Sequence, residues 1–153
     1  MKQIIISTVF LCAIACNNTA TNAANPTASG EPSETIAKPK HFRGAISNGM
    51  KGDSLSFDLS ADGKKLSNLE FHGYWRCAGK LERQPNIGPD GDFDVVNSIV
   101  DGHISEPPNG GSTAWRFDLK ATITANKAVG TFRMNINNLG CDTYLLKFEA
   151  LAR

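Results

Sequence analysis

The sequence predicts an all-β domain, and two features of its longer C-terminal part carry that prediction. From His41 onward, short runs of residues alternate between apolar and polar side chains, which is the period of a strand with one buried face. Turn-forming pairs such as Asn48-Gly49, Asp62-Gly63 and Asp101-Gly102 separate these runs. No stretch shows the period of an amphipathic helix. About seven strands in roughly 110 residues favour an antiparallel β-sandwich or a jelly-roll-like barrel.

Four runs show the alternation most clearly, and each places its apolar residues on a single face. The expected inward sets are Leu55, Phe57 and Leu59; Trp115, Phe117, Leu119, Ala121 and Ile123; Phe132, Met134 and Ile136; and Tyr144, Leu146, Phe148 and Ala150. We expect these faces to share one core.

The beginning of the chain has the three-part pattern of a secretory signal. Within residues 1–15, Lys2 provides the positive charge and an apolar run follows it. The stretch ends in Ala13-Ile14-Ala15, which places small residues at the two positions that signal peptidase recognises. An apolar helix of about twelve residues measures roughly 18 Å, too short to cross a hydrocarbon core of about 30 Å. We therefore expect a signal peptide over residues 1–15, with Cys12 removed in the mature protein.

Two kinds of cleavage are open, because Cys16 directly follows the small residues. Ordinary signal peptidase would leave Cys16 as a free thiol at the N-terminus. The segment also resembles a bacterial lipobox, with Ala13 where that pattern prefers Leu, and the resemblance implies that Cys16 is acylated. Since a secreted protein seldom keeps an unpaired thiol at its end, we favour the lipoprotein interpretation. Acyl chains on Cys16 would hold the protein on a membrane.

Residues 16–40 lack the apolar side chains that a folded segment needs. They consist mainly of Asn, Thr, Ala, Ser, Pro and Glu, and Ile36 is their only branched aliphatic residue. Such a composition cannot offset the entropy of ordering the chain, so we expect a flexible linker after Cys16. The β-domain then occupies residues 41–153. This organisation predicts a protein of the bacterial cell envelope, lipid-anchored and exposed outside the cytoplasm.

The charge of the chain argues against one class of partner. The sequence has 16 basic and 15 acidic residues, without a basic run or patch. Nucleic acid is therefore not expected as a partner.

The two cysteines of the β-domain are expected to pair. Cys77 ends one apolar run and Cys141 begins the last, and an exported chain folds in an oxidising compartment. The alternative is a pair of buried thiols. A zinc site is disfavoured, because His41, His72 and His103 lack ligand spacing to either cysteine.

Several motifs carry a family resemblance. The order "SFDLSADGKKLSNL", "CAGK", "IGPDGDF", "ANKAVGTFRM" and "GCDTYLLKFEA" resembles an uncharacterised group of small bacterial secreted or lipid-anchored domains with two cysteines. The resemblance covers nearly all of residues 44–152 and rests mainly on turns and core positions. It implies an all-β domain with a Cys77–Cys141 bridge. The group has no assigned activity, so no catalytic residues are carried over.

The most metal-like stretch is "DGDFD", which places Asp90, Asp92 and Asp94 at alternate positions. Oxygen ligands at such spacing occur in calcium loops, but the Gly and Glu of an EF-hand are missing here. We favour a turn that runs into an edge strand protected by charge, with no cofactor. Calcium held by these carboxylates is the alternative.

The run that leads to Cys77 offers a candidate ligand-binding surface. His72, Tyr74 and Arg76 alternate with apolar residues, so they should project together from the outer face. Tyrosine can stack on a sugar ring, and His and Arg can donate to hydroxyls or carboxylates. Arg116 and Arg133 would extend this surface if their strands are neighbours. An ordinary solvated sheet face would look the same.

No catalytic motif is present, and we do not expect an enzyme. Glu70 and Glu82 could be imagined as a glycosidase pair, but nothing in the sequence fixes their separation. The leading hypothesis is a non-enzymatic envelope domain that binds a glycan or a protein partner. The alternative is a structural or assembly component without a small-molecule site. A hydrolase would require two carboxylates that converge in a cleft.

Overall fold

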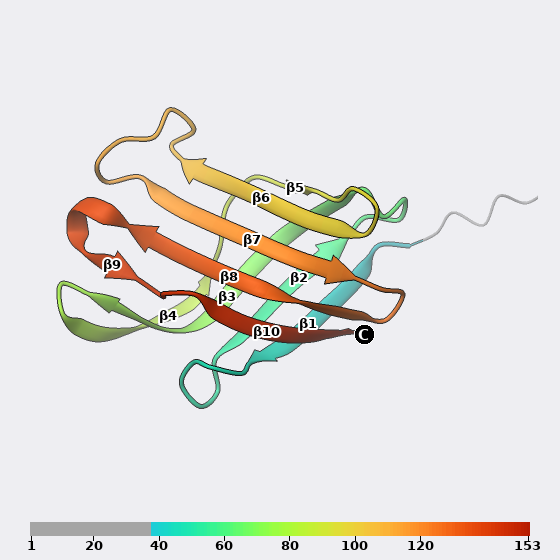
Figure 1. The fold of residues 1–153 in the computed structure, drawn as a ribbon, viewed down its shortest axis with the longest axis horizontal. Helices are drawn as coiled ribbons and strands as arrows, with labels where there is room; N and C mark the ends of the chain where they lie inside the picture. The colour runs from blue at the N-terminus through green and yellow to red at the C-terminus, as the bar shows by residue number, and fades with distance from the viewer. Residues whose placement is uncertain (1–37) are drawn as a thin grey trace, which may run out of the picture. The chain divides into compact units, whose positions relative to one another are not determined.

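The computed structural model describes residues 38–153, most of which belong to ten β-strands (Figure 1). The expected signal peptide, Cys16 and the expected linker up to residue 37 lie outside these residues, and what was expected of them stays a prediction. The first strand begins at Lys40, one residue before the expected start of the domain. The strands are β1 Lys40–Ile46, β2 Ser54–Leu59, β3 Lys65–Cys77, β4 Lys80–Ile87, β5 Phe93–Asp94, β6 Ile99–Glu106, β7 Trp115–Ile123, β8 Lys127–Ile136, β9 Cys141–Asp142 and β10 Leu146–Ala152.

The strands form a closed antiparallel barrel with extensions. Around the barrel, neighbours pair in the order β10-β1-β2-β3-β9-β8, and β8 also pairs with β10, which closes the ring of six strands. β7 and β6 continue the sheet from β8, while β4 and β5 pair with the other edge of β3 (Figure 1). The predicted all-β barrel class is confirmed. There are ten strands rather than about seven, partly because β5 and β9 have only two residues each.

The C-terminal segment changes its partner within a few residues. β9 pairs with β3 and β8, whereas β10 pairs with β1 and β8. Residues 143–145 lie between β9 and β10, and the loop of residues 47–53 lies opposite them, between β1 and β2. The wall of the barrel is therefore interrupted where β3, this loop and residues 143–145 meet.

Aromatic and aliphatic side chains fill the interior. Phe42 stacks on Phe57 with ring centroids 5.2 Å apart, and Phe57 meets Phe148 edge to face at 6.3 Å. The largest fully buried side chains include Phe42, Leu55, Phe57, Leu66, Phe71, Phe117, Leu119, Phe132 and Met134. The inward faces predicted from the alternation are confirmed for the first three runs, with Leu59 and Trp115 only partly buried. A single 3-10 turn, Asn137–Leu139, interrupts the strands, and no helix within residues 38–153 has the length and apolar character to cross a membrane.

Tyr144 departs from its predicted place in the core. Leu146, Phe148 and Ala150 are buried as expected, but Tyr144 is 60% exposed. It lies between β9 and β10 with a φ of 56°, so the alternation of the strand does not extend to it. The prediction was wrong because period-2 alternation holds only while the segment remains a strand.

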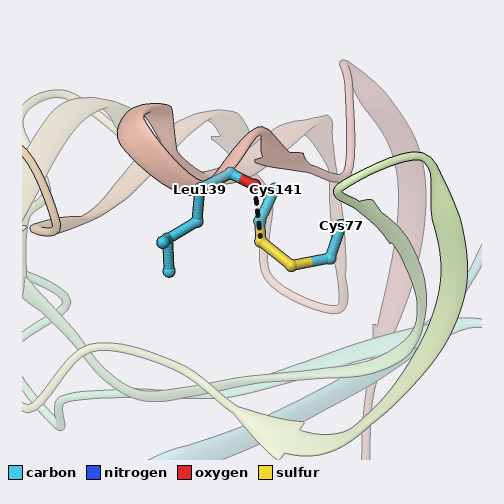
Figure 2. Close-up of a disulfide and its surroundings, with 3 residues drawn as sticks. All are labelled: Cys77, Leu139 and Cys141. Carbon is cyan, nitrogen blue, oxygen red and sulfur yellow. Dashed lines mark hydrogen bonds between the residues drawn. A yellow bond between two sulfur atoms is a disulfide. The ribbon is translucent and has the colours of Figure 1, made fainter.

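A disulfide joins Cys77 to Cys141, as predicted (Figure 2). The two residues are direct partners in the register of β3 and β9, and the Leu139 carbonyl oxygen lies 3.7 Å from Cys141 Sγ. Only one other residue pair, Arg76 with Asp142, connects these strands. The covalent bond therefore reinforces one of the two shortest pairings in the ring of the barrel.

Loss of this bond should lower stability without changing the fold. The bond closes a loop with a sequence separation of 64 residues, and the loop-closure entropy corresponds to about 4 kcal/mol. We expect a reductant to lower the free energy of unfolding by up to that amount in urea titrations of the mature protein. A Cys77→Ala/Cys141→Ala variant should start at the lower stability and be insensitive to the reductant. Equal sensitivity of both proteins to the reductant would contradict the assignment.

Candidate functional site

The structure places the three predicted ligand-binding residues on the outer face of β3, but in different surroundings. His72 is engaged with β4, where Arg83 Nη2 donates to its Nε2 at 2.7 Å and Asn86 Oδ1 lies 3.3 Å from its Nδ1. Tyr74 and Arg76 instead border a cleft. The candidate site therefore keeps Tyr74 and Arg76, while His72 lies beside it.

The cleft lies at the interruption in the barrel wall and has a volume of about 190 Å³. Three segments provide most of its lining: the loop between β1 and β2, the C-terminal half of β3, and residues 142–146 around the β9–β10 junction; Leu81 of β4 completes it. Its lining consists of Asn48, Gly49, Met50, Asp53, Tyr74, Trp75, Arg76, Leu81, Asp142, Thr143, Tyr144 and Leu146. A concave site thus lies next to Tyr74, as a binding role requires.

A buried carboxylate contributes to the cleft. Asp53 is only 3% exposed, and its Oδ2 accepts the Met50 N–H at 2.8 Å. Its Oδ1 is buried and has no hydrogen-bond partner within residues 38–153. Gly73 makes room for it, since a Cβ at that position would stand 2.8 Å from Oδ1. A buried acceptor without a partner is costly, by about 1–3 kcal/mol, and is therefore a candidate ligand contact.

Trp75 offers a matching donor. Its ring is 4% exposed and stacks on Trp115 with centroids 5.2 Å apart, which fixes the orientation of the indole. Its Nε1–H is buried and likewise lacks a partner in the described part of the chain. Two residues that line the cleft therefore carry unpaired buried groups, an acceptor on Asp53 and a donor on Trp75.

Tyr144, beside the cleft, has a backbone conformation that is unfavourable for residues other than glycine. Its φ of 56° lies in the left-handed region, which costs a non-glycine residue roughly 1–2 kcal/mol. Two side chains compensate: Asp142 Oδ1 accepts the Tyr144 N–H at 2.7 Å, and the Thr143 hydroxyl donates to the Tyr144 carbonyl at 3.0 Å. Strain of this kind at an exposed aromatic residue points to a functional role for the ring.

Arg133 fixes the orientation of Asp142. Its Nε and Nη2 donate to Oδ1 and Oδ2 of Asp142 at 3.0 and 2.5 Å, a bidentate ion pair. The hydrogen bond to Asp142 is the main reason why the pKa of Arg133 is raised. Arg133, on β8, thus acts through Asp142, on β9, to position Tyr144.

Two other predicted groups of side chains do not converge. Asp94 pairs with Lys65 at 2.8 Å on the β3–β5 ladder. Together with Asp90 and Asp92 it forms no metal-binding group, and no cluster of three or more acidic, His or Cys side chains in residues 38–153 could hold a metal. The stretch forms a turn and a short charged edge strand.

The imagined glycosidase pair is also too far apart. Glu82 lies opposite Trp75 in the β3–β4 register, and Glu70 lies five residues earlier on β3. At about 3.3 Å per residue, the two backbone positions are roughly 16 Å apart. Paired glycosidase carboxyl groups are about 5–9.5 Å apart.

Sequence reasoning missed four residues that the candidate site uses: Asp53, Trp75, Asp142 and Tyr144. One local signal was available: an Asp two residues before Tyr144 is the pattern of an Asx turn, which ends a strand. No comparable signal identifies Asp53, whose burial depends on contact with β3.

Comparison with known proteins identifies no relative: no protein-family model, no curated protein and no solved structure matches the chain significantly. The candidate site therefore rests on its own geometry.

The strain at Tyr144 predicts an unusual stability effect. We expect Tyr144→Gly to raise the free energy of unfolding by up to about 1 kcal/mol, because glycine adopts a positive φ freely and the exposed ring loses little packing. Leu145→Gly is the matched control, since Leu145 is 56% exposed and has no positive φ. In this control, the free energy of unfolding should fall by about 0.5–1 kcal/mol. Urea titrations of both variants test this, and an equal loss in both would contradict the interpretation.

Proposed function

We propose that this protein is a lipid-anchored binding domain of the cell envelope and that its cleft takes a glycan. One observation carries the proposal: the half-buried Tyr74 and the exposed Tyr144 line the cleft together with Asp53 and Trp75, whose buried acceptor and donor lack partners within residues 38–153. Ligand sites commonly have this composition, with aromatic side chains that provide contact area and a few polar groups that fix orientation.

A sugar complements these groups. Its ring has an apolar C–H face that can lie against Tyr74 or Tyr144, and its hydroxyls can both donate and accept. One hydroxyl can donate to Asp53 Oδ1, and another can accept from Trp75 Nε1–H. An apolar ligand would leave both buried polar atoms unsatisfied, so the cleft disfavours it.

The competing hypotheses have weaker support. A purely structural component needs no cleft and no strained Tyr144. Asp53 and Asp142 do line the same cleft, which a hydrolase would need. However, Asp142 is engaged by Arg133 and by the Tyr144 N–H, and one oxygen of Asp53 is engaged by Met50. These bonds serve to hold loops, so binding accounts for both carboxylates better than hydrolysis does.

The membrane anchor is the other part of the proposal, and its support comes from the sequence alone. Small residues followed by Cys16 favour acylation at that residue. An acylated Cys16 would place the domain, and with it the cleft, at a membrane surface outside the cytoplasm.

Glycan binding should depend on the two tyrosines at the cleft. In a glycan and peptidoglycan array, we expect the mature protein to bind at least one glycan, and Tyr74→Ala or Tyr144→Ala to weaken binding about tenfold, the equivalent of about 1.4 kcal/mol. Leu151→Ala removes an exposed apolar side chain outside the cleft and should bind like the parent. If the array stays silent while a purified envelope protein binds the domain, the glycan proposal is wrong.

The anchor predicts the chemistry of the mature N-terminus. We expect mass spectrometry of protein from bacterial membranes to find Cys16 as the first residue with its acyl groups. Cys16→Ser should release the protein into the soluble fraction, whereas Cys12→Ser should leave it on the membrane. Cys16 found as an unmodified thiol would refute the anchor.

A further inference from the structure

A polar row runs across the outer face of the sheet and ends at the cleft. In register, Ser105 pairs with Arg116, Arg116 with Asn135, Asn135 with Asp142, and Asp142 with Arg76. Direct cross-strand partners project to the same side of a sheet, so these five residues of β6, β7, β8, β9 and β3 form one continuous line. Arg76 and Asp142 also line the cleft. We call this line the polar row.

The polar row and its neighbour Arg133 have more guanidinium groups than carboxylates. Asp142 is the only acidic residue in the row, and both of its carboxylate oxygens accept hydrogen bonds from Arg133. The Arg76 side chain makes no hydrogen bond or ion pair with any residue that the structure describes, although it lies opposite Asp142. Among the described residues, the Arg116 side chain donates only to the Gly111 carbonyl, at 3.5 Å. Two arginines of the row therefore have no anionic partner.

The charged side chains beside the polar row do not neutralise Arg76 and Arg116. Asp118 lies opposite Arg133 and contributes to raising the pKa of that residue, but its Oδ1 is bound to His103 Nδ1 at 2.7 Å. The unpaired positive charge therefore remains at Arg76 and Arg116.

Three buried atoms at the other end of the row lack partners. Ser105 Oγ, Arg116 Nη1 and Asn135 Oδ1 are all buried and unpaired within residues 38–153, and Asn135 is only 5% exposed. They belong to consecutive residues of the row. Arg116 and Ser105 can donate to an anionic oxygen, and Asn135 can accept from a hydroxyl. A chain that carries both anionic groups and hydroxyls satisfies all three.

We propose that the ligand is an anionic linear glycan that continues from the cleft along the polar row, with one anionic group at Arg76 and another at Arg116. This inference rests on the proposed glycan-binding function. The two arginines are three strand spacings apart, about 14 Å, which is too far for a single sugar ring to span. The anionic groups are carboxylates or sulfate esters, since arginine binds both through paired hydrogen bonds.

Oligosaccharide probes that differ in length and charge test the contributions of the two ends of the row separately. The probes are galacturonic acid and its oligomers of increasing length, the uncharged galactose oligomers of the same lengths, and the pair dextran and dextran sulfate. Calorimetry with the mature protein should show tighter binding of a charged oligomer than of its uncharged counterpart, and the advantage should shrink as salt is added. The charged series that gains more affinity over its own uncharged counterpart indicates the preferred anionic group.

Variants test each arginine by itself. Arg76→Gln should weaken binding of short and long charged oligomers about tenfold, because Arg76 lies at the cleft. Arg116→Gln should weaken only the long oligomers, and Arg116→Lys should retain part of their affinity. Lys127→Gln is the control, because Lys127 pairs with Glu149 away from the row and should not alter binding. Circular dichroism confirms that each variant is folded.

The outcomes distinguish this inference from the proposed function. One outcome would overturn the inference and leave the proposed function in place. In it, uncharged oligomers bind as tightly as charged ones, both arginine variants bind like the parent, and Tyr144→Ala abolishes binding. The cleft then binds glycans but the polar row does not. If none of these probes nor any glycan on the array binds, the proposed function itself fails. Affinity that stops rising at the length of a single sugar would also overturn the extended row.

Discussion

The closure of the barrel depends on a short segment that has to pair with two different strands in succession. After β8, the chain forms β9 against β3 and then β10 against β1, with three residues between them. The β3–β9 contact has only two residue pairs, far fewer than the other pairings of the ring except β8–β9. Backbone hydrogen bonds alone give such a contact little stability. The Cys77–Cys141 bond at this point keeps β3 and β9 together and so stabilises the closed wall.

The change of partner leaves backbone groups that no neighbouring strand can satisfy, and polar side chains take over that role. Asn48 donates to the Leu145 carbonyl at 2.9 Å and accepts the Lys147 N–H at 2.6 Å. Asp142 and Thr143 do the same for Tyr144. Buried or half-buried backbone groups require such partners. The polar character of the cleft is therefore a consequence of barrel closure, and Tyr144 acquires its strained conformation from the same cause.

The alternation of apolar residues was sufficient to predict the barrel class, the inward faces of β2, β7 and β8, and the outward direction of Tyr74 and Arg76. Each of these features depends on strand periodicity, which is local. Tyr144 was placed wrongly because its strand is interrupted by a change of pairing partner, and that change depends on residues far away in the sequence. Asp53 was missed for a related reason: its burial arises from packing against Gly73 on another strand. The polar row is visible only once the register of five strands is known. The sequence predicts no more than that Arg116 and Arg133 extend the surface of β3 if their strands are neighbours.

The location of the site follows from how the interior is filled. Small barrels either pack their interior with side chains or enclose a ligand there. Here phenylalanine rings from β1, β2, β3, β8 and β10 pack the inside, and Phe117 of β7 joins the same buried cluster, so this barrel is of the packed kind. The outer wall is the remaining surface, and only where the wall is interrupted does a ligand reach buried groups such as Trp75 and Asp53. The disulfide and the stacked tryptophans hold β3, and the Arg133–Asp142 pair holds the β9 side. Asn48 ties the β1–β2 loop to Leu145 and Lys147, so the cleft is organised by contacts within the protein. The proposed binding there would require little ordering of the protein, and a modest number of contacts would then suffice for a specific complex.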